Sequence, residues 1–261
     1  MNGIITLLTD FGTSDAYVGI MKGVILGISP AVRLVDLTHE VPPQAIRLGA
    51  LVLRSAVEYF PARTIHLAVV DPGVGSTRQA VLVVAPRALL VGPDNGLLAP
   101  AARVLGAGQI YRLEREDLFR HPVSRTFHGR DVFAPVAAHL AAGTSPESVG
   151  PPVASLQPLD LPEPHAEIGA VHGEVIYVDH FGNLVTNISA AAIAGFPASG
   201  VSVTIAGMRI SPLAPTYAAV SSGAAVCVIG SWGMLEVAVR DGNAAERFGA
   251  GIATPISVVA E

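Results

Sequence analysis

Short aliphatic runs that each stop at a carboxylate are the feature that most constrains the fold of this chain. The runs are Ile4 to Leu8 before Asp10 and Ile65 to Val70 before Asp71, and a further strand expected over Val32 to Val35 also ends at a carboxylate, Asp36. Continuous apolar runs of this length are typical of strands buried on both faces of a parallel sheet. Apolar residues at helical spacing separate the runs, so we expect an α/β fold with a mainly parallel sheet flanked by helices.

The third run leads into the most distinctive loop of the chain, which reads DPGVGSTR from Asp71 to Arg78. Ligands of open α/β sheets bind beyond the carboxyl ends of the strands, so Asp71 stands where a reactive group is expected. Pro72 fixes its own φ and two glycines allow unusual backbone conformations, so the loop can bring Asp71 close to Arg78. A tight turn with a surface salt bridge is the alternative. Polar residues at the other strand ends favour a functional loop.

Helical spacing in the first half predicts helices over about 17–28, 44–59 and 97–105, and a strand pair over 80–85 and 89–91. Glycines recur every fourth residue in the first helix, at Gly19, Gly23 and Gly27. We expect them to let this helix pack closely against the sheet.

A histidine, His128, precedes an apolar helix that we predict over Val132 to Ala142. A histidine just ahead of a helix is well placed to face a ligand. The alternative is a histidine that only caps the start of the helix.

Six prolines crowd the segment from Thr144 to His165, which predicts a linker or an extended strap. We therefore expect an N-terminal α/β domain over 1–145, a Pro-rich linker over 146–166 and a smaller C-terminal β-barrel domain over 167–261. Short strands between glycine turns suggest the barrel, with a small sandwich as the alternative. The strands expected there are 173–178, 201–210 with a turn at Ala206-Gly207, 224–229, 235–239 and 255–259.

The charge balance argues for a small-molecule ligand. A net charge of -5 and a pI near 5.9 disfavour nucleic acid and anionic membranes as partners. Despite a mean hydropathy of +0.52, every apolar run is shorter than the roughly 20 residues that cross a bilayer. The single cysteine, Cys227, lies in an apolar run and cannot form a disulfide within the chain. We expect a cytoplasmic protein.

Carboxylates at strand ends allow several ligands. Asp10, Asp36, Asp71 and Asp94, with Asp179 from the second half, would give one crevice a large negative charge. A metal site is weakened because paired ligands such as H-x-H or D-x-D are absent from the sequence. A phosphate site is weakened because the glycine loop lacks the P-loop lysine. A nucleoside or a cationic substrate fits best.

Six motifs, in this order, resemble the S-adenosyl-L-methionine hydrolase (adenosyl-forming) family. They are Thr9-Asp10-Phe11-Gly12, Val70-Asp71-Pro72-Gly73-Val74-Gly75, Pro93-Asp94-Asn95-Gly96, Phe127-His128-Gly129-Arg130-Asp131, Asp179-His180-Phe181-Gly182-Asn183 and Gly242-Asn243-Ala244-Ala245. This family is also called the SAM hydroxide adenosyltransferases and is related to fluorinase and chlorinase. The resemblance implies a homotrimer with sites between subunits, which converts S-adenosyl-L-methionine (SAM) and water to adenosine and methionine without a cofactor or a metal.

The resemblance also implies residue roles. Its catalytic set falls on Asp71, Arg78 and His128, and an aspartate at 71 favours water over halide as the nucleophile. Arginine has no acceptor and cannot be the base, which leaves Asp71 and His128 as candidates. The implied substrate-binding residues are Asp10 for the ribose hydroxyls, Asp179 for the methionine ammonium, Phe181 for stacking near the adenine, Asn183 for the adenine edge and Ser231 for the methionine carboxylate. Trp232 departs from the halogenating relatives, which carry arginine there, and receives no role.

Three other functions remain open at this stage. A halide-dependent adenosyl transfer, as in a chlorinase, would use the same substrate. A non-catalytic SAM- or adenosine-binding protein would need only the binding residues, and the complete Asp71, Arg78 and His128 set argues against it. A metal-dependent phosphohydrolase is the third.

Overall fold

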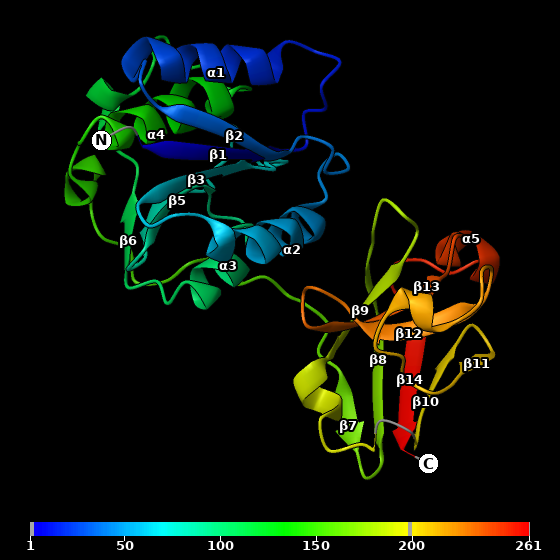
Figure 1. Ribbon diagram of the computed structural model, residues 1–261. Coiled ribbons are helices and arrows are strands. Elements are labelled where there is room, and N and C mark those ends of the chain that lie inside the picture. Colours follow the sequence, from blue (N-terminus) through cyan, green and yellow to red (C-terminus); the bar gives the residue numbers. More distant parts are fainter. Residues whose placement is uncertain (1–2, 198–199, 261) are drawn as a thin grey trace. The chain divides into compact units, whose positions relative to one another are not determined.

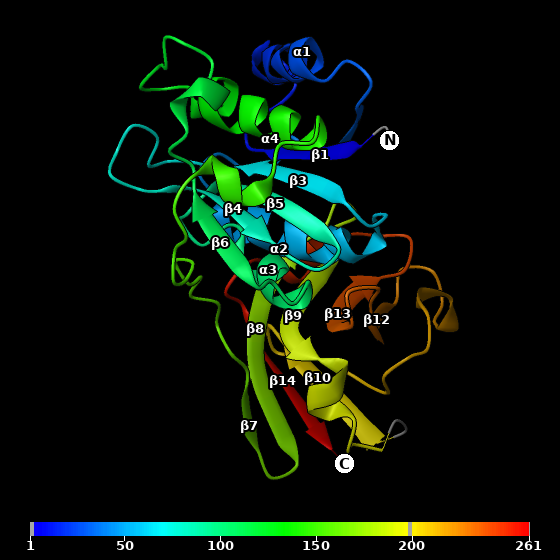
Figure 2. The same cartoon turned by 90° about the vertical axis from the view of Figure 1, so that its left-hand side faces the viewer.

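The computed structural model describes residues 3–197 and 200–260. The chain divides into two compact units, residues 1–160 and 161–261, each with its own core (Figures 1 and 2). Between 146 and 166 lie a 3-10 turn, η4 (Pro146–Val149), and the first residues of β7 (His165–Glu167). The linker and domain boundaries inferred from the sequence stay predictions.

The first unit is built on a mainly parallel sheet, as expected. Its strands are β1 (Ile4–Thr9), β2 (Arg33–Thr38), β3 (Thr64–Val69), β4 (Ala80–Val84), β5 (Ala88–Pro93) and β6 (Gln109–Arg112), in the spatial order β2-β1-β3-β5-β4-β6. The pairs β1–β2, β1–β3 and β3–β5 are parallel, whereas β4 runs antiparallel to both β5 and β6. The edge strand β6 was missed by sequence reasoning.

Helices cover both faces of this sheet (Figure 1). The helices α1 (Tyr17–Ile28) and α4 (Ala134–Ala141) pack on one face, with Met21, Ile25 and Val136 in the core there. The helices α2 (Ile46–Ala56) and α3 (Ala99–Val104) pack on the other, with Leu53 and Ala101 in a second cluster. Buried apolar residues on both faces explain why the strands read as continuous aliphatic runs.

The expected role of the glycines in α1 is wrong. The residues of this helix that face the core are Val18, Met21 and Ile25. Gly19, Gly23 and Gly27 are exposed, and a Cβ at any of them would meet no atom within 4 Å. Within unit 1 they lie on the outer side of the helix, away from the sheet.

The second unit is an antiparallel sheet that nearly closes into a barrel, as the sequence predicted. Its strands are β7, β8 (Ala170–Val178), β9 (Leu184–Ser189), β10 (Val201–Ile205), β11 (Met208–Ile210), β12 (Ala225–Ile229), β13 (Met234–Val239) and β14 (Pro255–Ala260). Their order is β11-β10-β14-β8-β9-β13-β12, with β7 beside β8, and the end strands β11 and β12 contact each other. Val175, Ile188 and Leu235 lie in the core, and α5 (Ala244–Phe248) packs against it. Strand β9 was not predicted.

Across the described residues, no helix is both long enough and apolar enough to span a membrane.

A buried histidine lies in the sheet of unit 1. His66 on β3 is fully buried, its Nδ1 is 2.8 Å from the hydroxyl of Thr6, and its ring meets the edge of Phe60. Burial lowers the pKa of His66 to about 4, because the charged ring would lose its hydration. The folded protein therefore holds this ring neutral at physiological pH.

We predict that acid destabilises the protein through His66. The His66 ring takes up a proton near pH 6.5 in the unfolded chain and near pH 4 in the folded chain. The contribution of the neutral ring to the free energy of unfolding is therefore complete above pH 6.5 and is lost as pH falls toward 4. Between pH 7.5 and 5 the free energy of unfolding should fall by about 2 kcal/mol. Urea titrations at both pH values measure this difference. His66→Gln should reduce it and His165→Gln, at an exposed site, should not; equal pH dependence in all three proteins would contradict the assignment.

Candidate functional site

Three of the predicted residues, Asp71, Arg78 and His128, meet in one hydrogen-bonded cluster in unit 1. The Nε of Arg78 donates to the two oxygens of Asp71 at 2.9 and 3.0 Å, and Nη2 donates to Asp71 Oδ2 as well. The same Nη2 lies 2.8 Å from Nδ1 of His128. The expectation that the loop brings Asp71 and Arg78 together is confirmed.

The cluster is shielded from water. The side chains of Asp71 and Arg78 are 5% and 11% exposed. The Arg78 guanidinium also stands 5.3 Å from the ring centroid of Phe133, which is fully buried. A desolvated guanidinium over an aromatic face gains a cation–π attraction, so Phe133 helps to hold Arg78 in place. Sequence reasoning gave Phe133 no role.

The contact with Arg78 determines where the proton sits on His128. A guanidinium has only donors, so it can bond Nδ1 only when that nitrogen carries no proton. The neutral ring then bears its proton on Nε2. Burial lowers the pKa of His128 and the positive charge of Arg78 lowers it further, while Asp71 opposes this to a smaller extent. His128 is thus held neutral, with Nε2 as a donor.

Backbone packing fixes the two loops that carry this cluster. Gly75 has φ +77°, and a Cβ there would lie 2.4 Å from the carbonyl oxygen of Arg125. Only glycine permits this approach, which locks the loop of Asp71 and Arg78 onto the loop that leads to His128. On the other side, the amide of Asn95 donates to the carbonyl of Val70 at 2.9 Å. Asp71 is therefore held from both sides.

A buried carboxylate, Asp131, helps to fix the segment that carries His128. His128 directly precedes a π-helical turn, η3 (Gly129–Phe133), and its side chain makes no capping bond, so the alternative of a simple helix cap is wrong. Asp131 is fully buried and accepts hydrogen bonds from Nε and Nη2 of Arg130, each at 2.7 Å. It also accepts the backbone N–H of Ser124. These bonds close the segment that carries His128. π-helical turns are frequent at functional sites.

Asp10 lies at the same edge of the sheet as Asp71. It follows β1 directly, and Thr9 at the end of β1 pairs with Val69 at the end of β3. One oxygen of Asp10 accepts the backbone N–H of Gln44 at 2.8 Å. The carboxylate keeps further lone pairs for a ligand.

Two of the other carboxylates expected at strand ends are engaged in structural contacts, so the expected crevice of many acids is reduced. Asp36 moreover lies within β2, which continues to Thr38, and not at its end. Asp36 pairs with Lys22 at 2.6 Å and with His39 at 3.1 Å. Asp94 accepts the backbone N–H of Gln157 at 2.8 Å and so holds the Pro-rich segment. Both carboxylates tie the chain to itself.

In unit 2, Asp179 and Asn183 form one turn after β8. Asp179 Oδ1 accepts the backbone N–H groups of Phe181 and Asn183, and Oδ2 accepts the side-chain amide of Asn183 at 2.8 Å. Gly182 has φ +81° and packs on Asn243, which caps α5. The ring of Phe181 is 72% exposed. The turn therefore combines a fixed carboxylate with an open aromatic face, while the Asn183 side chain is 9% exposed.

The turn between β12 and β13 carries Ser231, which is exposed, and Trp232, which is half-buried. Gly233 donates to the carbonyl of Gly230 at 2.9 Å and closes the turn. Trp232 packs on Tyr177, with ring centroids 5.1 Å apart. Tyr177 lies two residues before Asp179, so Trp232 connects the two polar clusters of unit 2.

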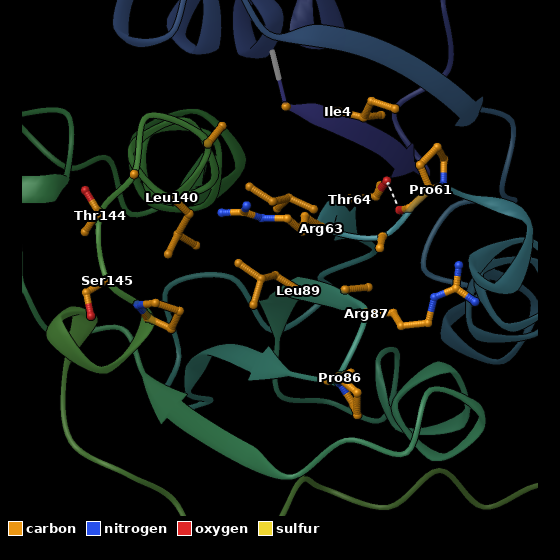
Figure 3. Close-up of a pocket in the computed structure, with 18 residues that line it drawn as sticks. Ile4, Pro61, Arg63, Thr64, Pro86, Arg87, Leu89, Leu140, Thr144 and Ser145 are labelled. Atoms are coloured by element: carbon orange, nitrogen blue, oxygen red, sulfur yellow. Dashed lines mark hydrogen bonds between the residues drawn. The ribbon is translucent and has the colours of Figure 1, made fainter. Parts of the chain in front are cut away.

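A cavity of about 630 Å³ in unit 1 adjoins two of the three catalytic candidates. Arg78 and His128 line it, together with Gln79, Glu114 and Phe119. A second cavity, of about 490 Å³, lies where β1, β3 and β5 begin, and Figure 3 shows Arg63 reaching between Leu89 and Leu140 there. It contains none of the predicted site residues. Among the described residues, no three His, Cys, Asp or Glu side chains gather as they would around a metal ion.

Comparisons with known proteins agree on one family. Residues 5–150 match the model of the SAM hydroxide adenosyltransferase N-terminal domain, and residues 173–257 match that of the C-terminal domain. The chain is 42% identical to an (R)-S-adenosyl-L-methionine hydrolase from Salinispora tropica, over 94% of this chain and 93% of the relative. It is 28% identical to a fluorinase from Nocardia brasiliensis, over 98% and 97%. A crystal structure of a conserved protein from Thermotoga maritima matches with a TM-score of 0.91 and 37% identity, over 98% of this chain and 99% of that one.

We predict that removing the charge of Arg78 raises the pKa of His128. In Arg78→Gln the guanidinium no longer opposes protonation, and Asp71 is left to favour it. NMR titration of the His128 ring measures the shift, with exposed His165 as the internal control. An unchanged pKa at His128 would show that Arg78 does not contact the ring in solution.

Proposed function

The chain belongs to the SAM hydroxide adenosyltransferase family, and we propose that it hydrolyses SAM to adenosine and L-methionine by attack of an activated water at the ribose C5′. The observation that carries this proposal is the contact of Asp71, Arg78 and His128, the set that the family resemblance implies. The chain matches its hydrolase relative over nearly its whole length.

The chemistry needs little more than a positioned and partly deprotonated water. The leaving group is a neutral thioether expelled from a sulfonium, so no acid has to protonate it. Orientation of the water and general-base help supply what remains. A site with one fixed carboxylate and two donors can provide both.

We propose that Asp71 takes the proton. His128 has its Nδ1 lone pair occupied by Arg78 and its proton on Nε2, so it would have to leave Arg78 before it could accept another. Asp71 Oδ1 accepts one bond from Arg78 and keeps a lone pair free, while Oδ2 accepts two. Arg78 then orients Asp71 and stabilises hydroxide character, and the Nε2–H of His128 orients the water.

Substrate binding is proposed for the remaining five residues. Asp10 accepts the ribose hydroxyls, and Asp179 accepts the methionine ammonium. Asn183 already donates to Asp179 and so offers its amide oxygen and second N–H to the adenine edge. Phe181 stacks near the adenine, and the Ser231 hydroxyl donates to the methionine carboxylate.

The proposed reaction uses no cofactor and no metal. Arg78 supplies the positive charge that a metal would otherwise bring to a developing hydroxide. Turnover that survives a chelator would exclude a metal-dependent phosphohydrolase.

Halide-dependent transfer is the second candidate. The lower identity to the fluorinase than to the hydrolase favours water. Incubating SAM with the pure protein in halide-free buffer decides between them. Chromatography should show adenosine and methionine, and a product that forms only with chloride would favour the transferase.

We further propose a cytoplasmic protein that works as a homotrimer. The family resemblance supports the trimer. Burial raises the pKa of Cys227 to about 12, so this free thiol is unreactive. An unreactive free thiol is compatible with a reducing compartment.

We predict that Asp71→Asn lowers kcat for SAM hydrolysis by about 10²–10⁴-fold, because the amide cannot act as a base. Adenosine binding, measured by calorimetry, should change little. The matched control is Asp160→Asn, at a carboxylate that is 98% exposed, and it should keep full activity. Normal turnover in Asp71→Asn would rule out the proposed base.

We predict complementation if the sites lie between subunits. Chains with Asp71→Asn and chains with Asp179→Ala, each inactive alone, should regain partial activity when refolded together, because some sites then receive both intact residues. The control mixes Asp71→Asn with His128→Gln, two changes in the same unit, and should stay inactive. Mixed trimers of the first pair without activity would place each site within one chain.

A further inference from the structure

Unit 2 contains a buried carboxylate to which the proposed function assigns no role. Glu236 on β13 is 6% exposed, and its Oε2 accepts the hydroxyl of Tyr217 at 2.6 Å. Tyr217 belongs to a separate segment, η7 (Tyr217–Ala219). A carboxylate is costly to bury, and a single neutral hydroxyl offsets only part of that cost.

The carboxylate of Glu236 lies directly against the turn that carries Ser231 and Trp232. Glu236 pairs with Val228 across the β12–β13 ladder, which makes Gly230 its diagonal neighbour on the same face. A Cβ on Gly230 would fall only 1.7 Å from Glu236 Oε1. Gly230 therefore leaves room for the Glu236 carboxylate in this position, and Glu236 supports the base of the turn.

Glu236 also lies within electrostatic range of Asp179. The negative charge of Asp179 acts on both Glu236 and Tyr217. The other titratable group nearby is Tyr177, which faces Asp179 and packs on Trp232. These four groups come from β8, the turn after it, η7 and β13, and none of them carries a positive charge. A site with two acids and three aromatic rings is suited to an organic cation.

We propose that Glu236, held by Tyr217 beneath the turn of Ser231 and Trp232, is a positioning and specificity residue for the cationic amino-acid half of SAM. This inference rests on the proposed function. Glu236 supports the turn that carries Ser231 and adds a second negative charge behind Asp179. Both effects favour a ligand that carries an ammonium and a sulfonium over a neutral nucleoside.

The state of Glu236 depends on pH. Burial raises its pKa, Asp179 raises it further, and the hydroxyl of Tyr217 opposes the rise. Glu236 is neutral below that pKa and charged above it. Attraction for the cation should therefore strengthen, and KM for SAM should fall, as pH rises through the pKa of Glu236.

Glu236→Gln tests the charge with almost no change of shape. We expect KM for SAM to rise about tenfold, which corresponds to roughly 1.4 kcal/mol, with kcat within about twofold because the variant keeps Asp71 and Arg78. Binding of adenosine should not change. Glu163→Gln is the control, with the same chemical change at an exposed site. The fall of KM with pH should disappear in Glu236→Gln and persist in the control.

Tyr217→Phe tests the same inference if Glu236→Gln folds poorly. Loss of the hydroxyl removes the bond that lowers the pKa of Glu236, so the fall of KM should move to higher pH. A merely structural tyrosine would not move that profile. An active wild type whose KM and pH profile are unaffected by both variants overturns this inference and leaves the hydrolase function standing. A wild type that does not cleave SAM overturns the function itself.

Discussion

The donor-only guanidinium of Arg78 is the interaction on which the rest of the candidate site depends. An ion pair as buried as that between Asp71 and Arg78 loses most of its hydration, and the Coulomb attraction compensates only when the geometry is good. Here Nε and Nη2 both bond the carboxylate, and Phe133 covers the guanidinium. Loss of either partner would leave an uncompensated charge, at a cost of about 3–5 kcal/mol. The ion pair of Asp71 and Arg78 therefore contributes to the stability of the fold as well as to the chemistry of the candidate site.

The same guanidinium decides how the other groups can act. Burial and the charge of this guanidinium both lower the pKa of His128 and keep its ring neutral. The bond from Arg78 to Nδ1 places the ring proton on Nε2, so Asp71 remains the acceptor of the cluster. This division of roles needs the two loops in exact register, and the contact between Gly75 and Arg125 provides it. A glycine that has no side chain to take part in the reaction therefore bears directly on which residue can be the base.

Much of the fold could be predicted because burial on both faces leaves an unambiguous pattern of aliphatic runs. Strands β6 and β9 escaped prediction because β6 is short, with one exposed and three half-buried residues, and β9 contains Thr186 and Asn187. The hydroxyl of Thr186 is buried and bonds the carbonyl of Leu235, a long-range contact that local pattern cannot show. The glycines of α1 misled for a similar reason, since their spacing is the same whether they face the sheet or the outside of the helix.

The contacts of the candidate site could be predicted where both partners lie in one short loop. They could not be predicted where a carboxylate bonds a residue that is distant in the sequence. The loop from Asp71 to Arg78 can close only in a few ways, so its ion pair could be foreseen from the residues. Asp36 and Asp94 look like ligand groups in the sequence, yet each binds a distant part of the chain. Their partners, Lys22 and Gln157, lie 14 and 63 residues away along the chain.

The electrostatic requirements of the proposed reaction differ at its two ends, and the described residues divide in the same way. A water that becomes hydroxide is stabilised by a nearby cation, and Arg78 is a desolvated cation. A substrate that carries a sulfonium and an ammonium is attracted by carboxylates, and Asp179 and Glu236 lie together in unit 2. The protein has a net charge of -5, yet it buries an arginine among its catalytic candidates. The cation that stabilises hydroxide and the carboxylates that attract the substrate are therefore different residues. Since the expelled thioether is neutral, no third group has to carry a proton to it, which is why a neutral His128 is sufficient.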